Sequence, residues 1–385
     1  METVTIDKLV PGGQGLGTLS SGKKAFVWGA LPGETVEFEI TKNKSSFCEG
    51  IATKILTKSE RRSNPRDLCY LATSPWQIMN YDYELEQKSA LVAECFHQNQ
   101  IDLPEIKPTV TDLKEYFYRN KMEYSLYWNN DTNKIELAFH TRGTHRKLPI
   151  TSSSIERSEV FQTAQRIVEQ LNTEQKPARD FQSLLVRCNQ QGIISSALFE
   201  NHKPHPAMPL LTDTLLGHQY FYSPNGFFQI NLPVYEMALK EIQKHTITLK
   251  VLDLYAGVGT IGLSVANNRE LTLVEVNETT YMELCKNCGD AENLNPVLAK
   301  SEDVLDYITP DATVILDPPR AGCDPKLIEK IAQVKPPTII YLSCNPITQA
   351  RDLKPLLATY QIKLCQPFNF FPHTPHIENL IVLTI

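Results

Sequence analysis

The sequence lacks several features that would place it in a specialised class of protein. Its 385 residues contain no apolar run long enough to span a bilayer, so we expect no membrane partner. The N-terminus has no basic start followed by an apolar stretch, and we therefore expect no secretory signal. Internal repeats and low-complexity tracts are missing too, which argues against a solenoid or a disordered chain.

Paired cysteines and excess positive charge are also scarce. The nine cysteines are odd in number and mostly isolated, which predicts reduced thiols and a cytoplasmic location. The formal net charge is −6, whereas a protein whose whole surface grips nucleic acid is usually basic. Any nucleic-acid contact must therefore use local basic patches.

The chain is longer than the roughly 250–300 residues at which a single core stops growing, so we expect several domains. Residues 1–58 contain short strands broken by turns, which predicts an OB-like barrel of the kind that binds oligonucleotides. Residues 59–215 mix helical and strand patterns and predict an α+β domain for nucleic-acid recognition. In residues 216–385 apolar strands alternate with helices, which predicts a Rossmann-like α/β domain with a mainly parallel sheet.

The central region contains a strand pattern rich in aromatic residues over 116–128. Arg119 and Lys121 lie within it, and basic residues among aromatics can contact phosphates while the rings stack on bases. These two residues are therefore candidate substrate contacts, although a sheet packed on a helix has the same composition.

A glycine-rich loop, DLYAGVGTIG, spans residues 253–262 between an expected strand and helix. Its glycines, Gly257 included, let the backbone approach a ligand closely, and Glu275 at the end of the next strand could accept hydrogen bonds from ribose hydroxyls. The pattern fits a dinucleotide or S-adenosylmethionine. Asp253 at its start and Asp303 after the next candidate strand favour S-adenosylmethionine.

Three further motifs follow expected strands. LDPPRAGC begins at Leu316 and contains Asp317, and its two prolines predict a rigid wall beside the ligand. Methyltransferases that act on amino groups usually have an aromatic residue where Arg320 follows these prolines, which argues against an amino target. YLSCNP contains Cys344, and FPHTPHIENL contains Glu378.

A thiol, a carboxylate and a methyl-donor site together suggest one reaction. Uracil C5 is a poor nucleophile until a thiolate adds to C6, and a base must later remove the C5 proton so that the thiolate can leave. Cys344 is the candidate nucleophile and Glu378 the candidate proton acceptor. Asp317 is the candidate that orients the edge of the uracil ring. His373, His376 and the pair Cys285 and Cys288 lack the pattern of a metal site, so we expect none.

In combination these motifs resemble the RNA 5-methyluridine (uracil-C5) methyltransferases that carry an N-terminal TRAM domain. PGGQGLG at residues 11–17 is similar to the start of TRAM, and FFQIN at 227–231 is similar to a cofactor-binding segment. The resemblance implies that Cys344 is the nucleophile and Glu378 the base. It also implies S-adenosylmethionine contacts, namely Gln229, Tyr255, Thr260, Glu275, Asp303 and Asp317.

One segment departs from the resemblance. Many members of this family bind an iron–sulfur cluster through four cysteines, three of which follow TRAM closely. Residues 63–81 of this chain contain only Cys69, and Thr73 and Trp76 lie roughly where other cysteines are expected. Such a cluster needs about four thiolate ligands, so we predict that this chain holds none.

The sequence thus predicts a monomer that methylates uracil C5 in RNA, with 23S ribosomal RNA slightly ahead of transfer RNA. Two other functions stay open. The chain could be an RNA-binding or chaperone protein that keeps the fold without the chemistry, or an amino-group methyltransferase. All three could bind the cofactor, but only the first requires Cys344.

Overall fold

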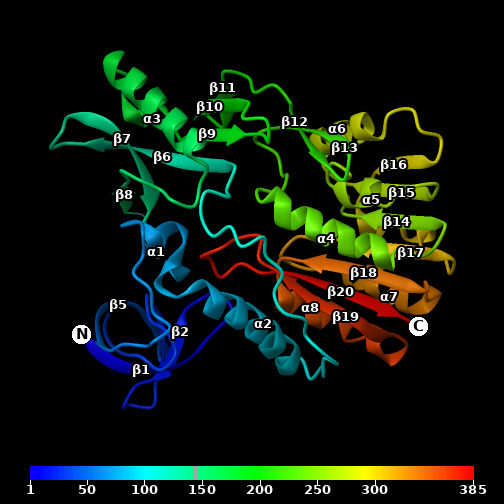
Figure 1. The fold of residues 1–385 in the computed structure, drawn as a ribbon, viewed down its shortest axis with the longest axis horizontal. Coiled ribbons are helices and arrows are strands. Elements are labelled where there is room, and N and C mark those ends of the chain that lie inside the picture. The colour runs from blue at the N-terminus through cyan, green and yellow to red at the C-terminus, as the bar shows by residue number, and fades with distance from the viewer. Residues whose placement is uncertain (143–145) are drawn as a thin grey trace.

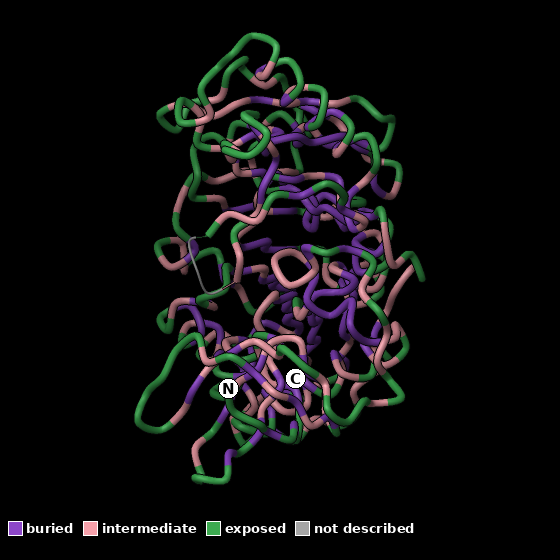
Figure 2. The backbone as a smooth tube through the Cα atoms, turned by 90° about the vertical axis from the view of Figure 1, so that its left-hand side faces the viewer, coloured by how far each residue is buried: buried purple, intermediate pink, exposed green. Residues whose placement is uncertain are grey.

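The computed structural model describes residues 1–142 and 146–385. In the view of Figure 1 the N-terminal barrel lies at the lower left, the central sheet at the upper left and the C-terminal sheet at the right. Helix α2 extends from the barrel to the C-terminal sheet (Figure 1). Buried backbone concentrates in the interior of the molecule, whereas exposed backbone lies mostly at the periphery (Figure 2).

Residues 1–57 form a closed barrel with the strand order β1-β2-β3-β5-β4. Alternation of apolar and polar residues explains its core, because Val4 and Ile6 of the first strand are buried while their neighbours are exposed. The expected OB-like barrel is confirmed. Its strands are β1 (Glu2–Leu9), β2 (Gly15–Thr18), β3 (Lys24–Trp28), β4 (Thr35–Asn43) and β5 (Phe47–Thr57).

The chain then forms three helical segments before the central sheet. These are α1 (Tyr70–Thr73), the 3₁₀ helix η1 (Pro75–Ile78) and α2 (Tyr81–Gln98). The buried residues Leu91 and Val92 of helix α2 join the hydrophobic core of the C-terminal sheet.

The central domain has, among the described residues, a six-stranded sheet in the order β11-β10-β9-β6-β7-β8. Helix α3 (Ser158–Thr173) packs on it through Val160, Ala164 and Val168, whose spacing places them on one helix face. The strand expected over 116–128 begins only at Lys121, because Phe117 has a positive φ of 55° that interrupts an extended backbone. The strands are β6 (Lys121–Asn129), β7 (Lys134–His140), β8 (Lys147–Pro149), β9 (Ser183–Cys188), β10 (Ile194–Glu200) and β11 (Lys203–His205), and the 3₁₀ helix η2 covers Ala178–Asp180.

Residues 250–384 contain a seven-stranded sheet in the order β16-β15-β14-β17-β18-β20-β19. The first five strands are parallel, whereas β20 runs antiparallel to both β18 and β19. Successive residues of β18 enter cores on opposite faces of the sheet, since Ile339 packs with α2 and α7 while Ile340 packs with α4. The expected Rossmann-like, mainly parallel sheet is therefore confirmed.

The remaining bounds place the elements of this region. The strands are β12 (Leu211–Leu215), β13 (His218–Tyr222), β14 (Lys250–Leu254), β15 (Glu270–Glu275), β16 (Leu294–Leu298), β17 (Ala312–Leu316), β18 (Thr338–Ser343), β19 (Gln361–Phe368) and β20 (Glu378–Thr384). The helices are α4 (Leu232–His245), α5 (Thr260–Ser264), α6 (Glu278–Cys288), α7 (Pro325–Val334) and α8 (Pro346–Leu353). The sequence pattern did not predict β12, β13, α4 or β19.

Candidate active site

A cleft of about 880 Å³ opens at the edge where the parallel strands of the C-terminal sheet end. Tyr255, Asp317 and Cys344 each directly follow one of these strands and line the cleft. This edge is where ligands of parallel α/β sheets bind, because the backbone and the side chains after each strand converge there.

Glu378 reaches the same edge from the opposite chain direction. It is the first residue of β20, which pairs antiparallel with β18 so that Ser343 lies opposite Asn379. Because β20 runs antiparallel to β18, the first residues of β20 lie beside the last residues of β18. Glu378 therefore lies beside Cys344, the residue that follows Ser343.

The glycine-rich loop is shaped by local hydrogen bonds. The buried carboxylate of Asp253 accepts a hydrogen bond of 2.8 Å from the Gly262 amide and so holds the start of α5 against β14. Gly257 has a φ of 58° and faces open space, while its amide donates to Glu275 Oε2 at 2.9 Å. A side chain at position 257 would therefore occupy the cleft and strain the backbone. The open glycine backbone beside a carboxylate fits the adenosine part of S-adenosylmethionine.

Most of the predicted site residues line this single cleft. They are Arg119, Gln229, Tyr255, Gly257, Thr260, Glu275, Asp317, Cys344 and Glu378. Two others do not line it. Asp303 is exposed at the end of the 3₁₀ helix Ser301–Asp303, and Lys121 donates from behind the cleft wall to the carbonyls of Asn225 and Gly226, both at 2.9 Å.

The thiol and the two carboxyls near it are electrostatically coupled. Burial, together with the nearby Glu378 and Asp317, raises the pKa of Cys344 to about 11, while Arg320 opposes the shift. Burial also raises the pKa of Asp317 to about 7 and holds that of Glu378 well above its usual range. Removing these groups from water disfavours their charged forms, and the nearby like charges add to the effect.

Arg320 and His376 also line the cleft, although sequence reasoning assigned neither residue a role in the site. Arg320 donates from its guanidinium to Nδ1 of His376 at 3.0 Å. Burial lowers the pKa of His376 to about 4, with Arg320 contributing, so its imidazole is neutral and can accept this bond. The pair places a fixed positive charge beside Cys344 and Glu378.

The wall formed by residues 223–229, which includes Gln229, is held by cations of the central sheet. Arg187 on β9 is fully buried and donates to the carbonyls of Phe228 at 2.8 Å and Gly226 at 3.3 Å. Its guanidinium also stacks on Tyr222 at 4.5 Å from the ring centroid. Arg187 and Lys121 thus hold the 223–229 segment through hydrogen bonds to its main-chain carbonyls.

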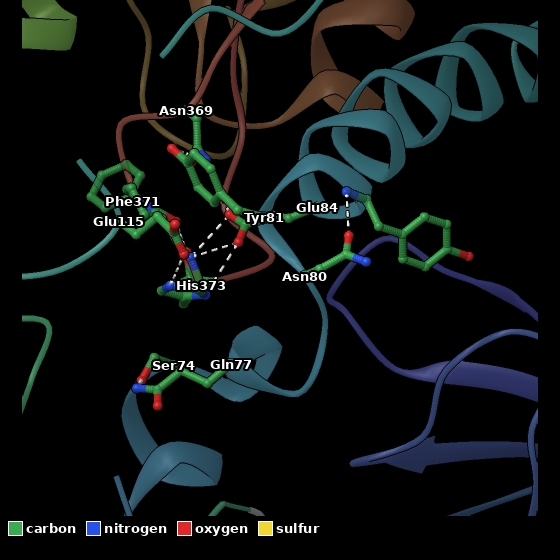
Figure 3. Close-up of polar contacts among 12 residues, drawn as sticks. Ser74, Gln77, Asn80, Tyr81, Glu84, Glu115, Asn369, Phe371 and His373 are labelled. Atoms are coloured by element: carbon green, nitrogen blue, oxygen red, sulfur yellow. Dashed lines mark hydrogen bonds and ion pairs between the residues drawn. The ribbon is translucent and has the colours of Figure 1, made fainter. Parts of the chain in front are cut away.

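The opposite wall is the 369–377 loop, which connects β19 to β20 and projects from the sheet towards α2 (Figures 1 and 3). The fully buried ammonium of Lys88 on α2 donates to Asn369 Oδ1 at 2.5 Å and to the Phe371 carbonyl at 3.1 Å. Glu84, one helical turn earlier, pairs with Lys88 at 3.1 Å and accepts from the His373 amide at 2.9 Å.

Two more contacts fix the same loop from outside the C-terminal sheet. The Tyr118 hydroxyl donates to the Pro372 carbonyl at 2.9 Å, and the Trp76 amide donates to the His373 carbonyl at 3.0 Å. The His373 ring lies between the carboxylates of Glu84 and Glu115, as Figure 3 shows. The loop that leads to Glu378 is thus bonded to residues 76–118.

The segment that departs from the family pattern is also packed against this loop. Trp76 is buried and donates from its indole to the Gly13 carbonyl at 3.1 Å, while the buried thiol of Cys69 donates to the Ser152 carbonyl at 3.7 Å. Within residues 1–142 and 146–385, no group of three or more His, Cys, Asp or Glu residues could hold a metal ion. The expected lack of an iron–sulfur cluster stays a prediction.

Comparisons with known proteins place these features in a family context. The model of the tRNA (uracil-5-)-methyltransferase family matches residues 300–385, which include Asp317, Cys344 and Glu378, and the TRAM domain model matches residues 2–53. The expected resemblance to the uracil-C5 RNA methyltransferases is confirmed. The expected enzyme class is confirmed by the same findings.

Two relatives and one solved structure are similar to this chain over nearly its whole length. An uncharacterized RNA methyltransferase of Bacillus anthracis is 29% identical, with 99% of this chain and 96% of the relative covered. Another from Thermotoga maritima is 25% identical over 100% and 99% of the two chains. The tRNA (uracil-54, C5)-methyltransferase of Pyrococcus abyssi, solved with S-adenosyl-L-homocysteine, shares the fold with a TM-score of 0.79, 24% identity and full coverage of both chains.

The domain boundaries, the monomeric state, the cytoplasmic location and the roles of the site residues also stay predictions. No helix in the described part of the chain is long and apolar enough to cross a membrane.

Proposed function

We propose that this protein methylates uracil at C5 in RNA, with Cys344 as nucleophile and Glu378 as base. The observation that carries this proposal is the convergence of Cys344, Glu378 and Asp317 on one cleft beside the glycine-rich loop. Among the functions considered, only uracil-C5 methylation requires a thiol and a carboxylate facing the same ligand.

The proposed reaction follows from the chemistry of these side chains. The Cys344 thiol loses its proton to solvent, and the sulfur of the resulting thiolate bonds to C6 of the uracil, which moves the electrons of the C5–C6 double bond onto C5 and O4. S-adenosylmethionine, when bound, would supply an electrophilic methyl group, so that the bond from C5 to the methyl forms as the sulfonium S–CH3 bond breaks and S-adenosylhomocysteine is left. Glu378 then removes the C5 proton, the C5–C6 double bond re-forms, and the Cys344 thiolate leaves. Arg320 stabilises the anionic forms of both side chains.

The cofactor contacts are proposed on the same basis. Gln229, Tyr255, Gly257, Thr260 and Glu275 line the cleft. In the strand order β15-β14-β17-β18, Asp317 after β17 lies between Tyr255 after β14 and Cys344 after β18. Arg119 lines the cleft and is retained as a substrate contact. Lys121 and Asp303 lie off the wall, so we assign Lys121 to holding the 223–229 segment and give Asp303 no direct contact.

The RNA substrate is the finer part of the proposal. Ribosomal RNA of the large subunit stays the first substrate to test, as the sequence suggested, and transfer RNA the second. The names of the matching family and of the P. abyssi enzyme both refer to tRNA, which makes the paired test necessary. The target uracil must leave its stack to reach the cleft.

RNA that contains 5-fluorouridine gives a direct test. Because fluorine cannot leave C5 as a proton does, the wild-type protein with S-adenosylmethionine should accumulate a covalent protein–RNA adduct that carries the new methyl group. Cys344→Ala should bind S-adenosylhomocysteine normally yet form no adduct and no 5-methyluridine. The matched control is Cys285→Ala, which removes a partly exposed thiol outside the cleft and should behave as wild type.

Glu378→Gln separates the two halves of the reaction. This variant should form a methylated adduct on ordinary RNA and release it slowly, because the C5 proton has no base. An absence of adduct in the wild type would favour a non-catalytic RNA-binding protein, and normal turnover in Cys344→Ala would remove the nucleophile assignment.

A further inference from the structure

The charge of the active-site cleft is unsuited to holding a polyanion. Four acidic side chains, from Glu275, Glu283, Asp317 and Glu378, line it together with two guanidinium groups, from Arg119 and Arg320. RNA affinity is dominated by the neutralisation of phosphates by lysine and arginine. A protein with a net charge of −6 therefore needs phosphate contacts outside this cleft.

A second cavity, the hairpin pocket, has the opposite character. It has a volume of about 670 Å³ and lies between the tip of the β6–β7 hairpin and the segment that follows α3. Its wall carries the cations Lys134, Lys176 and Arg179 and no carboxylate. None of these three exposed side chains forms an ion pair within the part of the chain that the structure describes, although Glu174 and Asp180 are sequence neighbours just outside the wall.

An aromatic ring completes the hairpin pocket. Trp128 is 45% exposed at the end of β6, whereas the earlier residues on the same face of the strand, such as Leu126, are buried under α3. Trp128 lies beside the last turn of α3, because its partner on β7, Ile135, is bonded to Asn172 of that turn. Asn172 fixes the floor, because its side chain bonds both the amide and the carbonyl of Ile135, at 2.7 and 3.0 Å.

We propose that the hairpin pocket binds an unpaired nucleotide of the RNA substrate, with its base stacked on Trp128 and its flanking phosphates on Lys134, Lys176 and Arg179. An exposed aromatic ring surrounded by unpaired cations is how proteins bind single-stranded nucleic acid without reading its sequence. The cavity is of a size that accommodates a nucleotide. The inference rests on the proposed function only in taking RNA as the substrate.

Tryptophan fluorescence tests the pocket directly, because the chain has only three tryptophans. Trp76 is buried and Trp28 is covered by the Arg142 guanidinium at 4.2 Å. A short single-stranded oligouridylate should quench the wild-type fluorescence. Trp128→Phe should remove most of the quenching, and the matched control Trp28→Phe should keep it. Poly-L-glutamate at the same charge should quench weakly.

Binding assays give the magnitudes. Trp128→Ala should raise the Kd for the oligouridylate roughly tenfold, while Trp128→Phe stays within about threefold because it retains a stacking face. Replacement of Lys134, Lys176 and Arg179 by alanine should lower the slope of log affinity against log salt by about 2, at roughly 0.7 for each phosphate that is no longer neutralised. In turnover, these variants should raise KM for RNA and leave kcat unchanged.

The outcomes separate this inference from the proposed function. Unchanged Kd and salt slope in Trp128→Ala and in the triple variant, or equal quenching by poly-L-glutamate, would overturn the nucleotide site. A wild type that forms no 5-fluorouridine adduct but shows quenching that depends on Trp128 would overturn the reaction and leave the pocket standing.

Discussion

The two walls of the active-site cleft are held in place by different kinds of contact. The 223–229 segment on the cofactor side is bound by two cations, Arg187 and Lys121, which donate only to main-chain carbonyls. The 369–377 loop on the side of Glu378 is bound by a buried ion pair, Lys88 with Glu84, which contacts both carbonyl and amide groups.

The difference predicts how each wall responds when its support is removed. A carbonyl that loses a donor can recruit water at the modest cost of a lost hydrogen bond. A buried charge that loses its partner cannot be solvated by water in this way, so the free-energy cost of its desolvation is no longer compensated. Both supports come from outside the C-terminal sheet, so the central domain and α2 serve the site by shaping its walls.

Lys88→Met should have the largest effect, because it leaves the carboxylate of Glu84 buried and unpaired. We expect it to lower the free energy of unfolding by about 3–5 kcal/mol, as seen when one partner of a buried ion pair is removed. The midpoint of urea-induced unfolding should fall accordingly. The double variant Lys88→Met with Glu84→Gln should recover a large part of the loss, since no charge is then left alone. A midpoint within experimental error of wild type in Lys88→Met would refute the ion pair's role.

Arg187→Met should act on the cofactor and less on folding. Losing its bonds to the Phe228 and Gly226 carbonyls frees the segment that carries Gln229, so we expect S-adenosylhomocysteine to bind about ten- to a hundredfold more weakly. Calorimetric titration measures the affinity. Arg166→Met is the matched control, because that exposed arginine of α3 bonds, among the described residues, only to Thr163, and its loss should leave the affinity unchanged. Equal affinities in the two variants would contradict the assignment.

The pH dependence should follow the raised pKa values on the Glu378 side. Cys344 and Glu378 both act as anions, and burial raises the pKa of both, with Asp317 adding to each effect and Arg320 opposing it. Lys88 also opposes it at Glu378. The reactive forms are therefore lost as pH falls, and the single-turnover formation of released 5-methyluridine RNA, which needs both anions, should rise between pH 6 and 9 by up to about tenfold per unit. A rate independent of pH in that range would contradict this electrostatic account.

The sequence predicted the parts of the site that follow strands. Tyr255, Asp317 and Cys344 come directly after apolar runs, and the carboxyl ends of parallel strands share one edge, so their convergence could be expected. Glu378 also followed from its position just before the last strand. The geometry that brings it there depends on β20 being antiparallel, which its apolar composition does not reveal.

The supports of the walls were harder to predict. Lys88 lies in an amphipathic helix where a lysine is usually exposed, and nothing in its neighbours indicates burial. Arg187 did leave a signal, because it interrupts the apolar run SLLVRC, and a lone charge in a buried strand calls for partners. Lys121 was assigned to RNA because it lies among aromatic residues, whereas its ammonium is directed to carbonyls of the protein.

Lys121→Met should have the smallest effect and sharpens the comparison within one wall. It removes two hydrogen bonds that Arg187 partly duplicates, since both cations contact the Gly226 carbonyl. We therefore expect S-adenosylhomocysteine to bind only two- to fivefold more weakly, which corresponds to about 0.4–1 kcal/mol.

Burial lowers the pKa of Lys121 to about 8, with the nearby Arg187 contributing. The wild-type ammonium therefore loses its charge above that pH, and the deficit of Lys121→Met should shrink between pH 7 and 9. The deficit of Arg187→Met should stay constant, because a guanidinium keeps its charge throughout. Parallel pH titrations of cofactor affinity in the two variants distinguish them, and a constant deficit in both would show that the charge of Lys121 does not matter.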